Sequence, residues 1–158
     1  MQRDNASGPE LRGLTLAIDR SVSFTHVPGD VHQRYARCSH PTALALERDI
    51  AALEYAEACR VTSSGMAAIT AVLMAVCRPG TTIFTHTVAY SGTLKLISRL
   101  SDQWGVIHEP LDLTSLNALE IAGCKSGDVL WLESPANPNL DILPMRALAS
   151  FARQHGLI

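Results

Sequence analysis

The chain has 158 residues, a net charge of −2, 47% hydrophobic residues and 18% charged residues. This balance excludes an intrinsically disordered chain and argues against a nucleic-acid-binding surface. No stretch of about 18 uncharged apolar residues occurs, so we expect no membrane-spanning helix. The polar start has no signal-peptide core, and the four cysteines form no CxxC pair. We therefore expect a cytoplasmic protein with free thiols and no metal site.

Residues 1–40 show no sustained hydrophobic periodicity and contain the turn formers Gly8, Pro9, Pro28 and Gly29. They predict an extended N-terminal arm. Two interpretations stay open: a free tail, or an arm that becomes ordered only against a partner.

Residues 41–158 alternate between β-prone runs and helical patterns, which predicts an α/β domain. Apolar residues at i, i+3, i+4 and i+7 mark the helices, and β-branched or aromatic runs mark the strands. We predict strands at 59–62, 81–85, 105–108 and 128–132, and helices at 41–53, 69–76, 94–100, 116–119 and 144–152. Alternation with short connections predicts a mostly parallel sheet with helices on both faces.

Ligands of such sheets bind in the loops that follow the carboxyl ends of the strands. The segment Ser63–Met66 lies in such a loop and opens a helix, where backbone N–H groups suit a phosphate or carboxylate. The alternative is an ordinary serine cap with a glycine for close packing. Tyr90 follows the strand 81–85 and either stacks on a planar ligand or covers the sheet edge.

The segment Glu133–Asn139 follows the strand 128–132 and contains two prolines. The prolines stiffen the loop and set the direction of Glu133 and Asn137, which favours a ligand site over a purely structural turn. Arg37 is able to contact a phosphate, although by itself it reads as a surface arginine.

Four segments, YARCSHPT, SSGMAAI, YSGT and ESPANPN, resemble in this order the N-terminal half of the Cys/Met-metabolism pyridoxal-phosphate (PLP) enzymes. That family includes cystathionine γ-synthases, cystathionine γ- and β-lyases, methionine γ-lyases and homoserine sulfhydrylases. The resemblance runs from about residue 20 to residue 158. It implies PLP as cofactor and identifies 41–158 as a partial fold-type-I large domain that lacks the family's C-terminal part.

The resemblance also implies site residues. Gly65 and Met66 match the turn whose N–H groups hold the PLP phosphate. Tyr90 matches the catalytic tyrosine that stacks on the pyridine ring and takes part in proton transfers. Asn137 matches the asparagine near the 3-oxygen of the ring, and Glu133 begins the same cofactor-binding motif.

Tyr35 and Arg37 match a pair that reaches the PLP phosphate of a neighbouring subunit in the family. This match implies that the arm takes part in an oligomer, here a hetero-oligomer. Three mild departures from the family pattern are His40 in place of asparagine, Ser63 in place of alanine and Ser91 in place of glycine.

The large departure concerns residues that the family places later in its sequence. These are an aspartate at the pyridinium nitrogen, the Schiff-base lysine and an arginine for the substrate carboxylate. Lys95 and Lys125 are the two lysines of this sequence, and neither stands in the family's lysine context. We therefore expect this chain alone to be inactive.

Three hypotheses follow. The first is a split transsulfuration-type lyase or transferase that acts by β- or γ-elimination or replacement on a sulfur-containing or O-activated amino acid. A complementary chain would supply the aspartate, lysine and arginine. The second is a catalytically inactive truncated remnant, and the third is a non-catalytic PLP- or phosphate-binding or regulatory subunit.

Overall fold

The computed structural model describes residues 18–24 and 35–158. The chain divides into two compact units, Met1–Val61 and Thr62–Ile158, and each is described by itself. Most of the predicted arm, 1–40, lies outside the described residues. The division falls after the first helix, and the predicted start of the α/β body at residue 41 stays a prediction.

The first unit contains α1, Pro41–Leu53. His40 precedes the helix in an extended conformation, and its Nδ1 accepts the Thr42 N–H at 3.2 Å. Pro41 stands at the first helical position, where its missing N–H has no cost. His40 therefore caps the helix with a ring nitrogen.

The prediction of a strand at 59–62 is wrong. This segment contains no strand, because its polar groups are turned toward α1 instead of toward another strand. The Val61 N–H donates to Glu47 Oε1 at 3.1 Å, and the Arg60 guanidinium pairs with Glu47 Oε2 at 2.9 Å. A β-branched run alone predicts an extended chain, which becomes a strand only when a neighbouring strand forms backbone hydrogen bonds with it.

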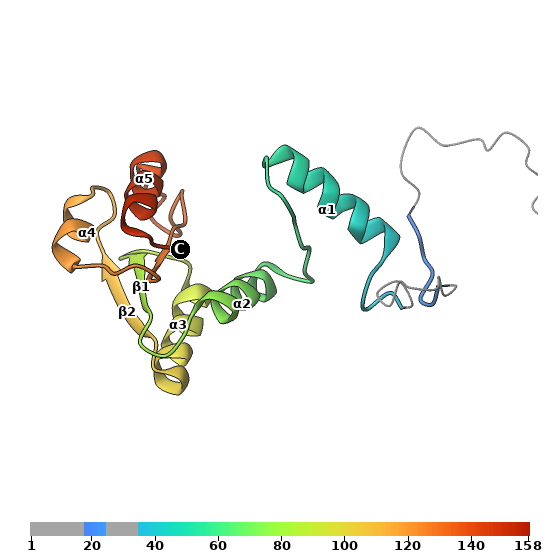
Figure 1. Ribbon diagram of the computed structural model, residues 1–158, viewed down its shortest axis with the longest axis horizontal. Coiled ribbons are helices and arrows are strands. Elements are labelled where there is room, and N and C mark those ends of the chain that lie inside the picture. The colour runs from blue at the N-terminus through green and yellow to red at the C-terminus, as the bar shows by residue number, and fades with distance from the viewer. Residues whose placement is uncertain (1–17, 25–34) are drawn as a thin grey trace, which may run out of the picture. The chain divides into compact units, whose positions relative to one another are not determined.

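The second unit confirms the predicted alternation of helices and strands (Figure 1). Its elements are α2 (Gly65–Val76), β1 (Thr82–His86), α3 (Ser91–Trp104), β2 (Ile107–Leu111), α4 (Asn117–Ala122), β3 (Val129–Trp131) and α5 (Met145–His155). The three strands form a parallel sheet in the order β2-β1-β3. Thr82 lies opposite Ile107, and Ile83 lies opposite Val129.

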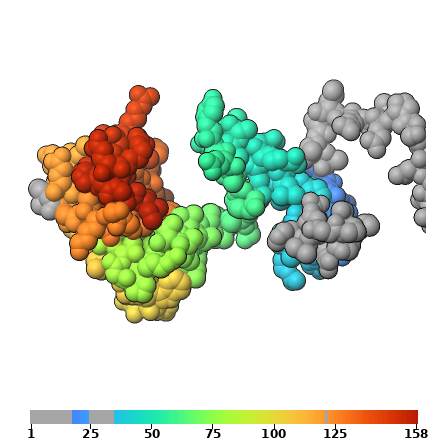
Figure 2. Space-filling view, in the orientation of Figure 1, coloured from blue at the N-terminus to red at the C-terminus, as the bar shows by residue number. Residues whose placement is uncertain are grey.

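Helices cover both faces of this sheet. Successive residues of a strand point to opposite faces, so Ile83 and Phe84 of β1 enter two different cores. The core around Ile83 receives side chains from α2 and α3, and the core around Phe84 receives side chains from α4 and α5. In the space-filling view this unit, coloured green to red, forms one continuous body (Figure 2).

The order of the strands creates a switch point between β1 and β3. The connection from β1 to β2 runs through α3 on one face, and the connection from β2 to β3 runs through α4 on the other. The loops after β1 and β3 therefore diverge from neighbouring strand ends. In parallel sheets this divergence opens the crevice in which ligands bind.

The outer edge of β3 makes further hydrogen bonds. The Ile158 N–H donates to the Asp128 carbonyl, and the Leu130 N–H donates to the Ile158 carbonyl, both at 2.9 Å. This is the pattern of a parallel bridge. No helix in the described part of the chain is long and apolar enough to cross a membrane.

Candidate functional site

The start of α2 presents free backbone donors. Ser64 is extended, with φ −162° and ψ 158°, and its Oγ accepts the Ala67 N–H at 3.1 Å. Within 18–24 and 35–158, no protein acceptor engages the N–H of Gly65 or Met66. A Cβ on Gly65 would meet nothing within 4 Å, so the space in front of these donors is open. The serine cap is therefore present and still leaves two N–H groups for an anion.

Tyr90 precedes α3 and lies beside Met66. The absent Cβ of Gly92 explains how closely they pack, because a Cβ there would collide with the Tyr90 ring and would lie 2.8 Å from Met66 Sδ. The Tyr90 side chain is 42% exposed. Gly92 thus lets an exposed aromatic ring lie next to the residues that open α2.

Glu133 fixes the backbone of this tyrosine. Its Oε2 accepts the Tyr90 N–H at 2.8 Å, and its Oε1 accepts the Thr93 hydroxyl at 2.8 Å and the Trp131 indole N–H at 3.0 Å. Burial acts to raise the pKa of the Glu133 carboxyl, but the three hydrogen bonds outweigh burial and hold the pKa below its ordinary value. Both carboxylate oxygens are thus engaged by protein donors.

Asn137 lies in a closed turn after β3. The Ala136 N–H donates to the Asp141 carbonyl at 2.9 Å, and the Leu140 N–H donates to the Ala136 carbonyl at 2.7 Å. Ala136 is fully buried, whereas Asn137 is exposed. The turn therefore anchors its apolar residue and presents its amide side chain to solvent.

Tyr35 and Arg37 lie in the first unit. The Arg37 guanidinium carbon is 5.3 Å from the centre of the Tyr35 ring, within the range of a cation–π contact. Arg37 and His40 line a cleft of about 530 Å³ beside α1. That Tyr35 and Arg37 reach the cofactor of a neighbouring subunit stays a prediction.

The structure thus joins Met66, Tyr90 and Glu133 in one constellation, with Asn137 four residues further along the loop. Sequence reasoning missed Thr93 and Trp131 as partners of Glu133. The sequence places Trp131 in an apolar strand, and only its indole N–H, which needs an acceptor when buried, points to a polar neighbour.

Comparison with known proteins identifies the family. The family model for Cys/Met metabolism PLP-dependent enzymes matches residues 9–158. The chain belongs to this family. A cystathionine gamma-synthase of Mycobacterium bovis is 39% identical over 115 residues, which cover 73% of this chain and 30% of the relative. An L-methionine gamma-lyase of Pseudomonas putida is 37% identical over 77% of this chain and 31% of the relative.

A solved structure agrees with this assignment. The cystathionine gamma synthase of Xanthomonas oryzae pv. oryzae, in complex with cystathionine, superposes with a TM-score of 0.84 at 29% identity. The match covers 96% of this chain and 40% of that one. The fold is therefore part of a fold-type-I PLP enzyme, and the chain spans 30% to 40% of the length of these relatives.

Family membership implies PLP as the cofactor, and the residues of the second unit fit it. The free N–H groups of Gly65 and Met66 at the positive end of α2 suit its phosphate. The exposed ring of Tyr90, held beside Met66, suits its planar pyridine ring.

Proposed function

We propose that this chain is the PLP-binding part of a transsulfuration-type lyase or transferase. The substrate would be a sulfur-containing or O-activated amino acid, and the reaction a β- or γ-elimination or replacement. A complementary chain would supply the lysine. One observation carries the proposal: unoccupied N–H donors and an exposed aromatic ring lie together at the carboxyl end of a parallel sheet.

The residues of this chain would bind and orient the cofactor. Gly65 and Met66 would hold the phosphate through backbone N–H groups, and Tyr90 would stack on the ring and move a proton through its hydroxyl. Asn137 would lie near the 3-oxygen, and Glu133 would act through the Tyr90 backbone that it holds at 2.8 Å. When bound, PLP supplies the electron sink for reactions at the amino acid.

The two lysines of this chain support the need for a second chain. Lys95 is exposed in α3, and Lys125 precedes β3, at the end of the sheet opposite to Tyr90. The hydrogen bonds between Ile158 and β3 have the pattern of a parallel bridge, which supports strand pairing at this edge of the sheet. Tyr35 and Arg37 would engage the phosphate of another subunit in the resulting hetero-oligomer. We expect this assembly in the cytoplasm, where the four free thiols persist.

A matched pair of variants at Gly65 tests cofactor binding. Gly65 is the first residue of α2, a position that accepts proline, and the extended Ser64 before it suits a following proline. Gly65→Pro therefore removes the N–H while the helix start is kept. Gly65→Ala retains the N–H, and its Cβ meets open space.

We expect PLP, titrated by absorbance and circular dichroism, to bind Gly65→Pro roughly 10- to 100-fold more weakly than wild type, because a charge-assisted hydrogen bond is lost. Gly65→Ala should bind PLP more tightly than Gly65→Pro, because it keeps the N–H. Equal binding by both variants would contradict the assigned phosphate turn. PLP binding without turnover in any reconstituted complex would favour a non-catalytic subunit, and failure to bind PLP at all would favour an inactive remnant.

A further inference from the structure

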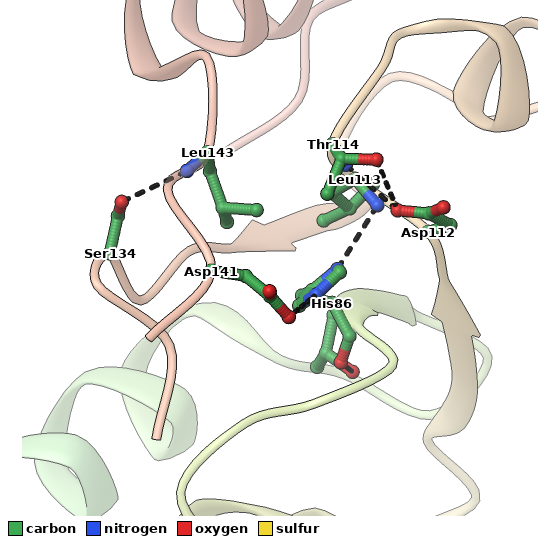
Figure 3. A network of polar contacts seen from close by, with 8 residues as sticks. His86, Asp112, Leu113, Thr114, Ser134, Asp141 and Leu143 are labelled. Atoms are coloured by element: carbon green, nitrogen blue, oxygen red, sulfur yellow. Dashed lines mark hydrogen bonds and ion pairs between the residues drawn. The ribbon is translucent and has the colours of Figure 1, made fainter. Parts of the chain in front are cut away.

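His86 contacts two loops at the carboxyl end of the sheet (Figure 3). It is the last residue of β1, the central strand, and only 4% of it is exposed. Its Nδ1 accepts the Leu113 N–H at 3.1 Å, and its Nε2 lies 3.3 Å from Asp141 Oδ2. Leu113 follows β2 and Asp141 follows β3. One buried ring therefore contacts the loops that leave both neighbouring strands.

The Leu113 contact determines where the proton of the ring resides. A backbone N–H can only donate, so Nδ1 of His86 must be the unprotonated nitrogen. The neutral ring then carries its proton on Nε2 and donates it to the Asp141 carboxylate. Each nitrogen thus has a fixed and different role, and the ring has one orientation.

The Leu113 side of this connection is rigid. Leu113 is fully buried in the core of α4 and α5. The next turn is closed by Asp112, whose Oδ1 accepts the Thr114 N–H at 3.0 Å and the Thr114 hydroxyl at 2.6 Å. His86 is therefore oriented from a well-anchored loop.

The Asp141 side is the turn that presents Asn137. Asp141 receives the Ala136 N–H on its carbonyl and the His86 proton on its carboxylate, so it joins the turn to β1. A second bond, from the Leu143 N–H to Ser134 Oγ at 3.0 Å, closes the base of the same loop. The position of Asp141 thus sets the position of the exposed Asn137.

We infer that His86 and Asp141 are positioning residues that hold the Asn137 turn in register with the rest of the site. As regards the cofactor, this inference rests on the proposed function. His86 and Asp141 touch the turn and not the cofactor-binding groups assigned above. Their effect on PLP would pass through the turn.

Substitution of His86 by Asn or by Gln keeps one of its two hydrogen bonds and removes the other. In His86→Asn the amide oxygen takes the place of Nδ1 and keeps the Leu113 bond, while the donor to Asp141 is lost. In His86→Gln the amide nitrogen takes the place of Nε2 and keeps the Asp141 bond. Asp141→Ala removes the acceptor, and Asp141→Asn retains one acceptor oxygen. Asp141 is 37% exposed, so its variants are expected to fold even where a change at the buried His86 does not.

Amide hydrogen exchange on the full 158-residue chain tests the connection between His86 and the Asn137 turn, and it needs no cofactor. We expect Asp141→Ala and His86→Asn to speed exchange at Ala136 and Leu140 by roughly 3- to 10-fold, the effect of one lost hydrogen bond. Leu113 exchange should stay unchanged in both. His86→Gln should speed exchange at Leu113 and leave exchange at Ala136 and Leu140 unchanged. Asp141→Asn should behave like wild type.

Titration with PLP then connects the turn to the site. We expect Asp141→Ala to bind PLP roughly 3- to 10-fold more weakly and Asp141→Asn to restore binding. Unchanged exchange in Asp141→Ala, or a ring proton found on Nδ1 by nitrogen NMR, would overturn the inference. Altered exchange with unchanged PLP affinity would overturn the positioning role alone. If wild-type chain binds no PLP, the proposed function fails, whereas the exchange pattern still decides the connection between β1 and the turn.

Discussion

At the scale of single residues, both oxygens of the Glu133 carboxylate are engaged by protein donors. Its oxygens accept hydrogen bonds from the backbone of Tyr90 and from the side chains of Thr93 and Trp131. These donors need a full acceptor on both oxygens. The ionised carboxylate is the side chain that provides it.

Replacement of Glu133 by Gln tests this role. The amide group of Gln would face N–H and O–H donors with its own NH₂, so we expect a loss of about 1–3 kcal/mol of unfolding free energy. Tyr90 should become more mobile, seen as line broadening of its ring signals. Glu57→Gln, at an exposed position, is the matched control and should have a small effect. A Glu133→Gln variant as stable as the control would contradict the assigned network.

The same carboxylate predicts the direction of a pH dependence. The pKa of Glu133 is lowered from its ordinary value of 4.5 in the folded chain, so the unfolded chain binds the proton more readily. Its stabilising effect is therefore fully present above about pH 5 and is lost as the pH falls through the lower folded pKa. In urea unfolding, wild type should lose more stability than Glu133→Gln between pH 5 and 3. Parallel losses in both proteins would assign the acid sensitivity to other groups.

Sequence reasoning reached Glu133 and Tyr90 as single residues but not their connection. The two are 43 residues apart, and their hydrogen bond comes from a backbone N–H. Every residue except proline has this donor, so the sequence does not indicate the bond. His86 and Asp141 were missed for a similar reason, since they are 55 residues apart and meet only when β1 and β3 pair. Local patterns predict the loops that carry a site, and the sheet decides which side chains meet.

At the scale of elements, the C-terminal ends of α3, α4 and α5 are capped by glycines with positive φ. Gly105 caps the end of α3 and Gly156 caps the end of α5, both with φ +68°. A Cβ on Gly105 would meet open space, whereas a Cβ on Gly156 would lie 2.6 Å from Ser126 Oγ. The carbonyl of Gly156 also accepts the Gly127 N–H at 2.9 Å. The end of α5 is thus packed against the loop before β3.

This contrast predicts unequal effects of alanine. Gly105→Ala should cost about 1 kcal/mol, the strain of a side chain in the left-handed region. Gly156→Ala should cost more, because the contact with Ser126 is added to the same strain. Ser126→Gly, combined with Gly156→Ala, should recover the unfolding free energy lost to the contact with Ser126 and leave the loss that comes from backbone strain. Urea midpoints of wild type, the two alanine variants and the combined variant measure these differences. Equal losses of stability in the two alanine variants would refute the steric account.

The elements themselves were largely predictable because their periodicities are local. The helices and the three strands of the second unit follow from patterns of four to twelve residues, and their order predicts the parallel sheet. The segment 59–62 has the same local character as those strands. It forms none because Glu47 of α1 takes the Val61 N–H, a contact 14 residues away that propensity does not report.

At the scale of the whole molecule, the chain combines a group of residues that fits PLP with a fraction of its relatives' length. It covers 30% of a cystathionine gamma-synthase and 40% of a solved relative. The free N–H groups at α2 and the Tyr90 ring both belong to the second unit, so we expect this part of the site to form without another chain. We therefore expect binding of PLP to be separable from turnover of a substrate.

We expect the chain alone to bind PLP and to release neither α-keto acid nor thiol from a sulfur-containing or O-activated amino acid. Lys95 is exposed in α3, and Lys125 lies at the end of the sheet opposite to Tyr90. Neither lysine is placed to take part in the reaction. Turnover should begin when a second chain that carries the family's lysine segment is added, and a lysine-to-alanine form of that chain should abolish it. Tyr90→Phe in the complex should lower kcat with little change in PLP affinity, because the ring stays and the hydroxyl is lost. Turnover by the single chain that disappears in Lys95→Ala or Lys125→Ala would instead assign the lysine to this chain.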